Sequence, residues 1–279
     1  MRTPFRTNAE LPGWFRSGVI FGVAGLLTIL EYRRALRKSQ LEPKARREIR
    51  NLVIAATAGL VMQFCERPPS VWLARKVNAR AWGIAPVLSR SPLAQTLLSV
   101  ALLDYGLYIW HVLTHKVPFL WRFHLVHHID LDLDASTALR FHFGEMVLSV
   151  PWRLAQIFVV GASPLALSIW QTFLFASILF HHSNVKLPWK SEQILRFLIT
   201  TPRLHGIHHE ADQARTNSNW SSGFALWDML HGTQLWDATT GEIGVPAYQE
   251  QEDVKLACCL ILPFKQQRAD WVSESGQHS

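Results

Sequence analysis

Histidines at repeated spacings are the residues of this chain best suited to chemistry. Eleven of the thirteen lie between His111 and His209. Eight of these form one H-x-x-x-H motif and two H-x-x-H-H motifs: His111 and His115; His124, His127 and His128; His205, His208 and His209. On a helix, residues three and four positions apart project from the same face. The first motif is therefore expected to present two imidazoles to one point, and each of the others three.

Eight convergent imidazoles predict a site for two metal ions. They supply about four ligands per ion, leave positions open for oxygen or a substrate, and suit iron, zinc, copper or nickel. The alternative is that they are core or interfacial histidines with ordinary hydrogen bonds. Three clustered motifs beside apolar segments favour the metal site, because unpaired polar groups are costly there and are commonly functional.

Two carboxylates lie close to these motifs in the sequence. Asp104 precedes His111 by seven positions, which is two helical turns on the same stripe. It is expected either to accept the outer N–H of a ligand histidine, fixing its tautomer, or to face a polar interior of the helix bundle. Glu145 is expected either to bind metal or, as the favoured interpretation, to form an ion pair with Arg140.

Five histidines stand outside the three motifs. His142 stands singly, and the adjacent pair His181 and His182 closes a long apolar region. His231 is expected to be structural because it falls outside the spacing pattern. His278, in a polar C-terminal segment, is expected to be solvated.

Hydrophobic residues make up 49% of the 279 residues and fall in four blocks. These are Gly18–Leu30, Leu52–Phe64, Pro92–Val112 and Met146–Phe180. Since a spanning helix needs about 20 apolar residues, the third block is long enough, and the fourth is long enough for two helices with a turn at 161–164. The first two are expected to span by borrowing flanking residues or to lie at the membrane interface.

The expected fold is an all-α integral membrane protein with about four transmembrane or interfacial helices and a cytoplasmic histidine-rich catalytic cap. The side follows from the basic residues between the first two blocks, because positively charged loops stay in the cytoplasm. These residues are Arg33, Arg34, Arg37, Lys38, Lys44, Arg46, Arg47 and Arg50. The expected domains are N-terminal anchoring segments with a basic loop (1–91), a catalytic domain (92–240) and a C-terminal tail (241–279).

The net charge of +7 does not indicate a nucleic-acid partner. The basic residues concentrate between apolar blocks, as at an anionic membrane face, and no nucleic-acid-binding motif accompanies them. The three cysteines, Cys65, Cys258 and Cys259, form neither an even framework nor a C-x-x-C pair, which disfavours disulfides and a zinc finger. The first apolar run is expected to be a retained anchor rather than a cleaved signal.

Several ordered motifs resemble the fatty acid hydroxylase/sterol desaturase superfamily. The first two boxes of that family are matched by Asp104-Tyr105-x-x-Tyr108-x-Trp110-His111-x-x-x-His115 and by Leu120-Trp121-Arg122-Phe123-His124-Leu125-Val126-His127-His128. The third is matched by Thr201-Pro202-x-x-His205-x-x-His208-His209. The closing signature is matched by Asn217-Ser218-Asn219 and Trp227-Asp228-x-x-x-Gly232-Thr233. The order and spacing of the motifs carry the resemblance.

The resemblance implies a non-haem centre of two iron ions (Fe2+) in a cytoplasmic cap above membrane helices. It implies O2 as oxidant, electrons from an external cytochrome b5- or ferredoxin-like donor, and a lipid substrate that is hydroxylated or desaturated. The membrane would be a bacterial inner membrane or the endoplasmic reticulum. The implied ligands are the eight motif histidines with His142 and His182, His181 being an alternative to His182. Asp104, Arg140 and Glu145 are the further expected residues of the catalytic site.

The chain departs from the family pattern at three positions. Val112 and Phe143 stand where the family often has Arg and Pro, and His231 stands where it commonly has Phe. None of these removes a box histidine, so the departures bear on the substrate rather than on the metal.

Three rival functions are consistent with some of these residues. The first is a membrane zinc-dependent lipid hydrolase, whose usual H-E-x-x-H signature is absent from the sequence. The second is a bis-histidine haem carrier, which leaves most of the clustered histidines unexplained. The third is a non-catalytic scaffold with residual metal sites. No ferredoxin-type cysteine motif or dinucleotide fingerprint is evident, so an oxygenase would need a separate electron donor.

Overall fold

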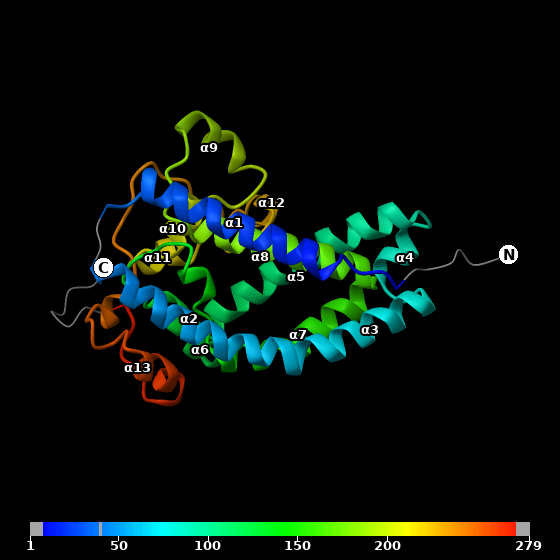
Figure 1. Ribbon diagram of the computed structural model, residues 1–279, viewed down its shortest axis with the longest axis horizontal. Coiled ribbons are helices and arrows are strands. Elements are labelled where there is room, and N and C mark those ends of the chain that lie inside the picture. The colour runs from blue at the N-terminus through cyan, green and yellow to red at the C-terminus, as the bar shows by residue number, and fades with distance from the viewer. Residues whose placement is uncertain (1–7, 39–40, 272–279) are drawn as a thin grey trace.

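Long apolar segments alternate with short charged ones, and in the computed structural model the long segments become the helices of an elongated bundle (Figure 1). The structure describes residues 8–38 and 41–271. Short helices that include α10 and α13 gather at one end of the bundle, and α4 lies at the other (Figure 1).

Within these residues, extended segments pair only through three isolated bridges, and the predicted all-α class is confirmed. The larger helices are α1 (Gly13–Arg33), α2 (Lys44–Val61), α3 (Arg67–Arg80), α5 (Pro92–Lys116), α6 (Pro118–His128), α7 (Phe143–Val160) and α8 (Pro164–His182). The shorter α-helices are α4 (Ile84–Leu88), α9 (Trp189–Leu195), α10 (Pro202–His208), α11 (Gln213–Thr216), α12 (Leu226–His231) and α13 (Leu256–Ile261). A π-helical turn, η1 (Met62–Glu66), and three 3-10 turns, η2 (Thr137–Leu139), η3 (Pro246–Tyr248) and η4 (Leu262–Phe264), complete the set.

Four helices, α1, α5, α7 and α8, are long and apolar enough to cross a membrane, as judged by length and composition. They arise from the first, third and fourth apolar blocks, and the fourth block divides into two helices as predicted. The chain turns between α7 and α8 at Gly161, whose φ of 73° favours glycine. A Cβ there would lie 2.0 Å from the Trp82 carbonyl oxygen, so the turn can pack closely on the α3–α4 connection.

The second apolar block differs from the others because it continues a charged helix. It forms the apolar half of α2, and the chain passes through η1 into α3 without leaving the helical path. This segment is not one of the four candidate spans. Within η1 Glu66 is buried, and its Oε1 lies 3.5 Å from Nε of Arg153 on α7. The buried ion pair therefore links this segment to a candidate membrane helix.

The basic segment between the first two apolar blocks, which includes the start of α2, is not simply a charged loop at a membrane face. Arg47 and Arg50 are buried, although the sequence placed them among the positive charges that set the orientation. Arg47 pairs with Asp134 and with Asp130 at 3.0 Å, and Arg50 binds Glu42 at 2.7 Å. They lie inside the protein because carboxylates from the segment after α6 meet them there.

Asp130, two residues after His128, is the centre of this ionic cluster. Its carboxylate accepts hydrogen bonds from Arg47 (3.0 Å), Arg50 (3.2 Å) and the Thr137 hydroxyl (2.8 Å). Burial alone raises the pKa of Asp130, but the neighbouring arginines outweigh it and hold the pKa below its ordinary value. The carboxylate is therefore ionised and fixes the end of α6 against α2.

Arg140 belongs to the same cluster, and the expected ion pair between Arg140 and Glu145 is wrong. The fully buried guanidinium donates from Nε to the Val126 carbonyl at 2.7 Å and from Nη1 to Asn51 at 3.0 Å. Its Nη1 also lies 3.7 Å from the Asp130 carboxylate. Arg140 thus braces the backbone of α6, while Glu145 faces a histidine.

The segment expected to be a C-terminal tail packs, as far as the structure describes it, against α6 and α2. One hydrophobic core holds residues from all three parts of the chain: Ile54, Trp121, Leu125, Val126, Ile129, Leu131, Val245, Ala247, Tyr248, Val254 and Cys259. The Arg122 side chain also donates to the Pro263 carbonyl at 2.9 Å. Residues 243–264 therefore support the back of the second histidine box.

The ionic cluster yields a stability prediction. Asp130→Ala leaves three buried arginines without their central carboxylate, and we expect it to lower the free energy of unfolding by about 3–5 kcal/mol. Equilibrium unfolding in detergent measures this loss. The matched control is Glu252→Ala, which removes an exposed carboxylate paired with Lys255 and should cost at most about 1 kcal/mol. Equal losses in the two variants would show that the cluster contributes no more than a surface ion pair.

Candidate metal centre

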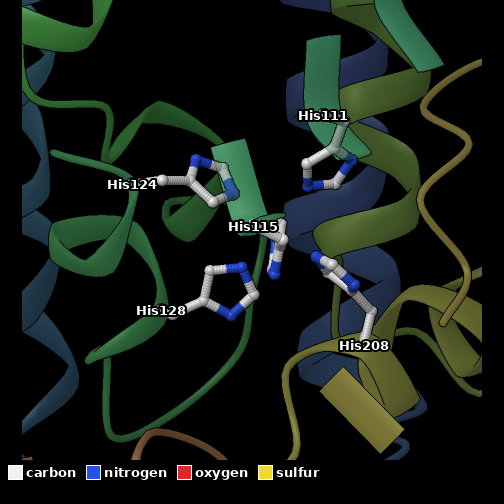
Figure 2. Close-up of side chains that lie close together, drawn as sticks. All are labelled: His111, His115, His124, His128 and His208. Atoms are coloured by element: carbon white, nitrogen blue, oxygen red, sulfur yellow. The ribbon is translucent and has the colours of Figure 1, made fainter. Parts of the chain in front are cut away.

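Nine buried or nearly buried histidines converge in two groups at one end of the bundle. The five-histidine group consists of His111, His115, His124, His128 and His208, and the four-histidine group of His127, His182, His205 and His209. In each group, one nitrogen from every ring lies within 4.8 Å of the others. Figure 2 shows the five-histidine group, with the rings from separate helices turned toward a common centre.

Each H-x-x-H-H motif is divided between the two groups, so the expectation of three imidazoles at one point is wrong. His124 and His128 of α6 join the five-histidine group, while His127 joins the other. At the end of α10 the division is reversed, because His205 and His209 go to the four-histidine group and His208 does not. Positions three and four residues along a helix differ by about 100° in direction, so adjacent histidines face different centres.

Helix ends supply the remaining ligand candidates. His111 and His115 lie one turn apart in the last two turns of α5. Pro118 then opens α6 after a single connecting residue, Val117, which brings the second motif back onto the first. His182 is the last residue of α8. The grouped histidines thus come from the ends of two candidate spans, α5 and α8, and from the shorter helices α6 and α10.

Backbone carbonyls fix the outer nitrogens of three imidazoles. Nδ1 of His111 lies 2.7 Å from the Trp220 oxygen, Nδ1 of His208 lies 2.8 Å from the Ser218 oxygen, and Nδ1 of His182 lies 2.9 Å from the Ile178 oxygen. A carbonyl only accepts, so each Nδ1 carries the proton and each Nε2 keeps its lone pair toward the group. This is the outer-partner arrangement of metal-bound histidines.

A carboxylate plays the same part for His124. Its Nδ1 lies 3.1 Å from Oε1 of Glu145, and both side chains are buried. Nε2 of His124 has no hydrogen-bond partner and lies on the side of the five-histidine group. Glu145 therefore orients a candidate ligand, as in a carboxylate–histidine–metal triad.

The inner nitrogens lack partners that protein groups could supply. Buried ring nitrogens without a hydrogen bond include both those of His128 and Nε2 of His115 and His208. In the other group, Nε2 of His182 lies 3.0 Å from Nε2 of both His127 and His205. Buried lone pairs that face one another need a shared cation, and an all-imidazole set suits iron, zinc, copper or nickel. The residues therefore fit two metal ions.

Burial keeps five of these imidazoles, on α6 and at α10, neutral. Loss of solvation, reinforced by neighbouring histidines, holds the pKa values of His127, His128, His205 and His209 well below their ordinary range. Burial lowers the pKa of His208 to about 3. Neutral imidazole is the metal-binding form, so the fold presents lone pairs without proton competition near neutral pH.

The loop that supplies the Ser218 and Trp220 carbonyls was not identified as part of the site from the sequence. Asn219, between them, has a left-handed backbone (φ 51°), and its side chain donates to the Leu204 and Leu235 carbonyls, both at 2.8 Å. The Asp228 carboxylate accepts from the Trp220 amide at 3.0 Å. Asn219 and Asp228 indicate a turn in the sequence, because asparagine and aspartate favour such backbone conformations. They do not indicate which backbone carbonyls face the imidazoles.

Asp104 and Arg140 are not placed beside the imidazole nitrogens. Oδ2 of Asp104 accepts from the Phe224 amide at 3.0 Å and from the Trp227 indole at 2.7 Å. It holds a segment of the chain against α5 rather than orienting a histidine, so that expectation is corrected by the geometry. Arg140 braces α6 as described above.

Among the described residues, three other histidines lie outside the two groups. His142 caps α7, accepting from Gly144 at 2.9 Å, and its Nε2 faces the Leu260 carbonyl at 3.1 Å, so both ring nitrogens have backbone partners. His181 packs on the His205 ring but belongs to neither group, whereas His182 belongs to the four-histidine group. His231 is exposed and lies 3.1 Å from the Tyr105 hydroxyl, consistent with its expected structural role. His278 lies outside the described residues.

Comparison with known proteins decides the family. The model of the fatty acid hydroxylase family matches residues 96–233, the segment that carries all nine grouped histidines. Residues 96–233 form a domain of the fatty acid hydroxylase family. The resemblance inferred from the motifs is thereby confirmed.

Relatives in this superfamily carry the names of lipid-modifying oxygenases. The ornithine lipid hydroxylase of Rhizobium tropici is 34% identical over 140 residues, which are 50% of this chain and 41% of the relative. The cholesterol 25-hydroxylase of Mus musculus is 27% identical over 143 residues (50% and 47%). The alkylglycerol monooxygenase of Xenopus tropicalis is 28% identical over 130 residues (47% and 28%). The match thus spans half or less of each relative, and no solved structure matches the chain significantly.

The Glu145–His124 pair of this fatty acid hydroxylase domain predicts a metal-binding defect. We expect Glu145→Ala to bind metal about 10- to 100-fold more weakly, because His124 loses its outer partner. Glu145→Gln keeps an acceptor oxygen and should lose less. Competition with a metal-binding dye measures the affinity, with Glu48→Ala on the exposed side of α2 as control. Equal affinities of Glu145→Ala and Glu48→Ala would contradict the orienting role.

The depressed histidine pKa values predict how metal binding responds to acid. An imidazole of ordinary pKa near 6.5 loses about fourfold in its neutral fraction at pH 6, and a site built from nine such imidazoles would lose metal affinity steeply. Here the folded pKa values are lower, so affinity measured at pH 8, 7 and 6 should change little. The metal-free fold should lose stability below about pH 6.5, because only the unfolded chain then takes up protons. A steep loss of affinity between pH 8 and 6 would contradict the neutral, buried site.

Proposed function

We propose that this protein is a membrane di-iron oxygenase that uses O2 to hydroxylate or desaturate a lipid. The observation that carries the proposal is the pair of buried histidine groups at the end of the candidate membrane helices. Membership of the superfamily supports it, since relatives are named as hydroxylases and monooxygenases. Their names favour hydroxylation and a lipid such as a fatty acyl chain, a sterol or an ornithine- or ether-linked lipid.

The nine grouped histidines would hold the two irons, the five-histidine group one and the four-histidine group the other. Bound iron supplies the one-electron and O2 chemistry that no side chain can perform. In hydroxylation, one oxygen atom of O2 enters a C–H bond and the other leaves as water, with two electrons and two protons consumed. Desaturation consumes the same electrons and protons, removes two hydrogens and releases two waters.

The protein's own residues do three things for this reaction. The Trp220 and Ser218 carbonyls and the Glu145 carboxylate hold imidazole N–H groups on the outer side, so that lone pairs point inward. Burial excludes water, which keeps the imidazoles neutral and protects reactive species from side reactions. The position beside apolar helices allows a lipid chain to arrive without crossing water.

The remaining features of the proposal come from the sequence. The electrons would come from a separate cytochrome b5- or ferredoxin-like donor. The site would face the cytoplasm, in a bacterial inner membrane or the endoplasmic reticulum, because basic residues crowd the segment after α1. Arg47 and Arg50 are buried in ion pairs, so they contribute less to this charge bias than their number suggests. Labelling of Lys190, which is exposed at the same end, with a membrane-impermeant reagent would show directly on which side of the membrane the site lies.

The first test is metal content of the detergent-purified protein, together with turnover of a membrane lipid extract with and without oxygen. We expect about two irons per chain and new hydroxyl or alkene products that require O2 and an added electron donor. His208→Ala should lower metal content and abolish turnover, whereas the matched His278→Ala should change neither. Zinc with oxygen-independent cleavage of the lipid would instead identify a hydrolase. Full iron content and turnover in His208→Ala would overturn the ligand assignment.

A further inference from the structure

One segment of the histidine-rich end reaches far down the sides of two candidate membrane helices. Phe224 and Trp227 donate to Asp104 of α5, and the Phe224 ring stacks on Phe173 of α8 with centroids 4.8 Å apart. Asp104 and Phe173 precede His111 and His181 by seven and eight residues. At 1.5 Å per residue, both contacts lie about 10–12 Å below the level of the histidines.

This depth falls within the apolar length of both helices. α5 and α8 are candidate spans, and Asp104 and Phe173 lie near the middle of each. The hydrocarbon layer of a membrane is about 30 Å thick. A segment that packs against the middle of a helix crossing this layer therefore lies at the same depth, within the hydrocarbon. The segment around α12 is therefore placed beside the membrane interior rather than above it.

Non-helical backbone can exist at such a depth only if its polar groups have partners. Here they do. The Thr200 amide donates to the Gly223 carbonyl at 3.1 Å, the Ala225 amide to the Leu198 carbonyl at 3.2 Å, and the Phe224 amide to Asp104. These bonds join residues 196–201 to residues 222–231, and we refer to the two strips together as the lip.

Close packing seats the lip on α5. A Cβ at Gly223 would lie 2.3 Å from Oδ1 of Asp104 and 2.8 Å from the Phe173 ring, so only glycine allows this approach. Trp227 packs on Tyr105 with ring centroids 4.9 Å apart. The buried carboxylate that the sequence offered as a partner for a histidine is thus the anchor of the lip.

The outward face of the lip is apolar. Phe197 is 48% exposed, Leu198 61%, Leu226 50% and Leu230 66%. Large apolar side chains gathered at this level beside membrane helices are typical of a lipid-facing surface. At the edge of the lip, Trp189 and Trp236 pack together, and the guanidinium of Arg196, the first residue of the lip, covers Trp236. Tryptophan and arginine with exposed apolar neighbours are characteristic of a membrane interface.

We infer that the lip is a re-entrant element whose outer face is covered by lipid acyl chains. The covering partner is hydrocarbon, because the face continues the lipid-facing surface of α5 and lies at the depth of that helix's apolar middle. The lip begins directly after Trp220 and Ser221, and the Trp220 carbonyl holds His111. It therefore links the bilayer to the edge of the metal centre, where a lipid substrate would enter sideways. The lipid contact itself does not depend on the proposed reaction.

Spin labels report the environment of the lip directly. Cys65 and Cys258 are replaced by Ser, the buried Cys259 is kept, and a nitroxide is attached at Leu198→Cys or Leu230→Cys in phosphatidylcholine vesicles. Leu97→Cys, 62% exposed on α5, is the membrane reference, and Leu41→Cys, 51% exposed in the segment after α1, is the matched reference outside it. Apolar O2 concentrates in hydrocarbon, whereas a charged or polar nickel complex stays in water.

We expect the labels at Leu198 and Leu230 to collide with O2 and to be shielded from the nickel complex, as at Leu97. Access to the nickel complex equal to that at Leu41 would overturn the inference. Dipolar broadening that disappears on dilution with unlabelled protein would mean that a second copy, not lipid, covers the face. Each labelled variant is first checked for unchanged metal content, and Leu226→Cys replaces any variant that fails this check. Loss of turnover in any of them does not affect the readout.

Discussion

Neutral imidazoles packed with their lone pairs toward one another are a configuration that protein groups alone do not stabilise. A buried acceptor without a donor costs free energy, and the cost is repeated at His115, His124, His128 and His208. Protonation would supply donors, but at His128 and His208 burial lowers the pKa and makes the charged form unfavourable. A divalent cation would bind the lone pairs without any imidazole being protonated. The rest of the structure keeps the imidazole nitrogens facing inward.

Most of that architecture acts on the outer nitrogens and on the backbone that carries the rings. Carbonyls at Trp220 and Ser218 fix two tautomers, and they come from a loop held by Asn219 and Asp228. On the opposite side, Asp130 and its arginines fix the end of α6 directly after the second motif. The positions of the imidazoles therefore depend on two polar networks outside the histidine groups: the one around Asn219 and Asp228, and the one around Asp130.

The membrane helices place a second constraint on the metal centre. Two candidate spans, α5 and α8, carry grouped histidines at their C-terminal ends, so their apolar surfaces bring hydrocarbon close to the site. The lip continues this surface and is anchored by Asp104, a carboxylate that would be expensive in lipid without its two donors. The lipid substrate proposed for this protein would need such proximity, because an apolar molecule does not leave the bilayer readily.

The sequence by itself determined the helical membrane class, the division of the fourth apolar block, and eight of the nine grouped histidines as ligand candidates, with His182 from the family pattern. These follow from local rules, since apolar length and i to i+4 spacing are properties of one segment. Tertiary structure alone decided that each H-x-x-H-H motif serves two centres, that Glu145 faces His124 rather than Arg140, and that Asp104 anchors the lip. The reason is that these outcomes depend on which distant residue arrives opposite, and neither spacing nor composition carries that information.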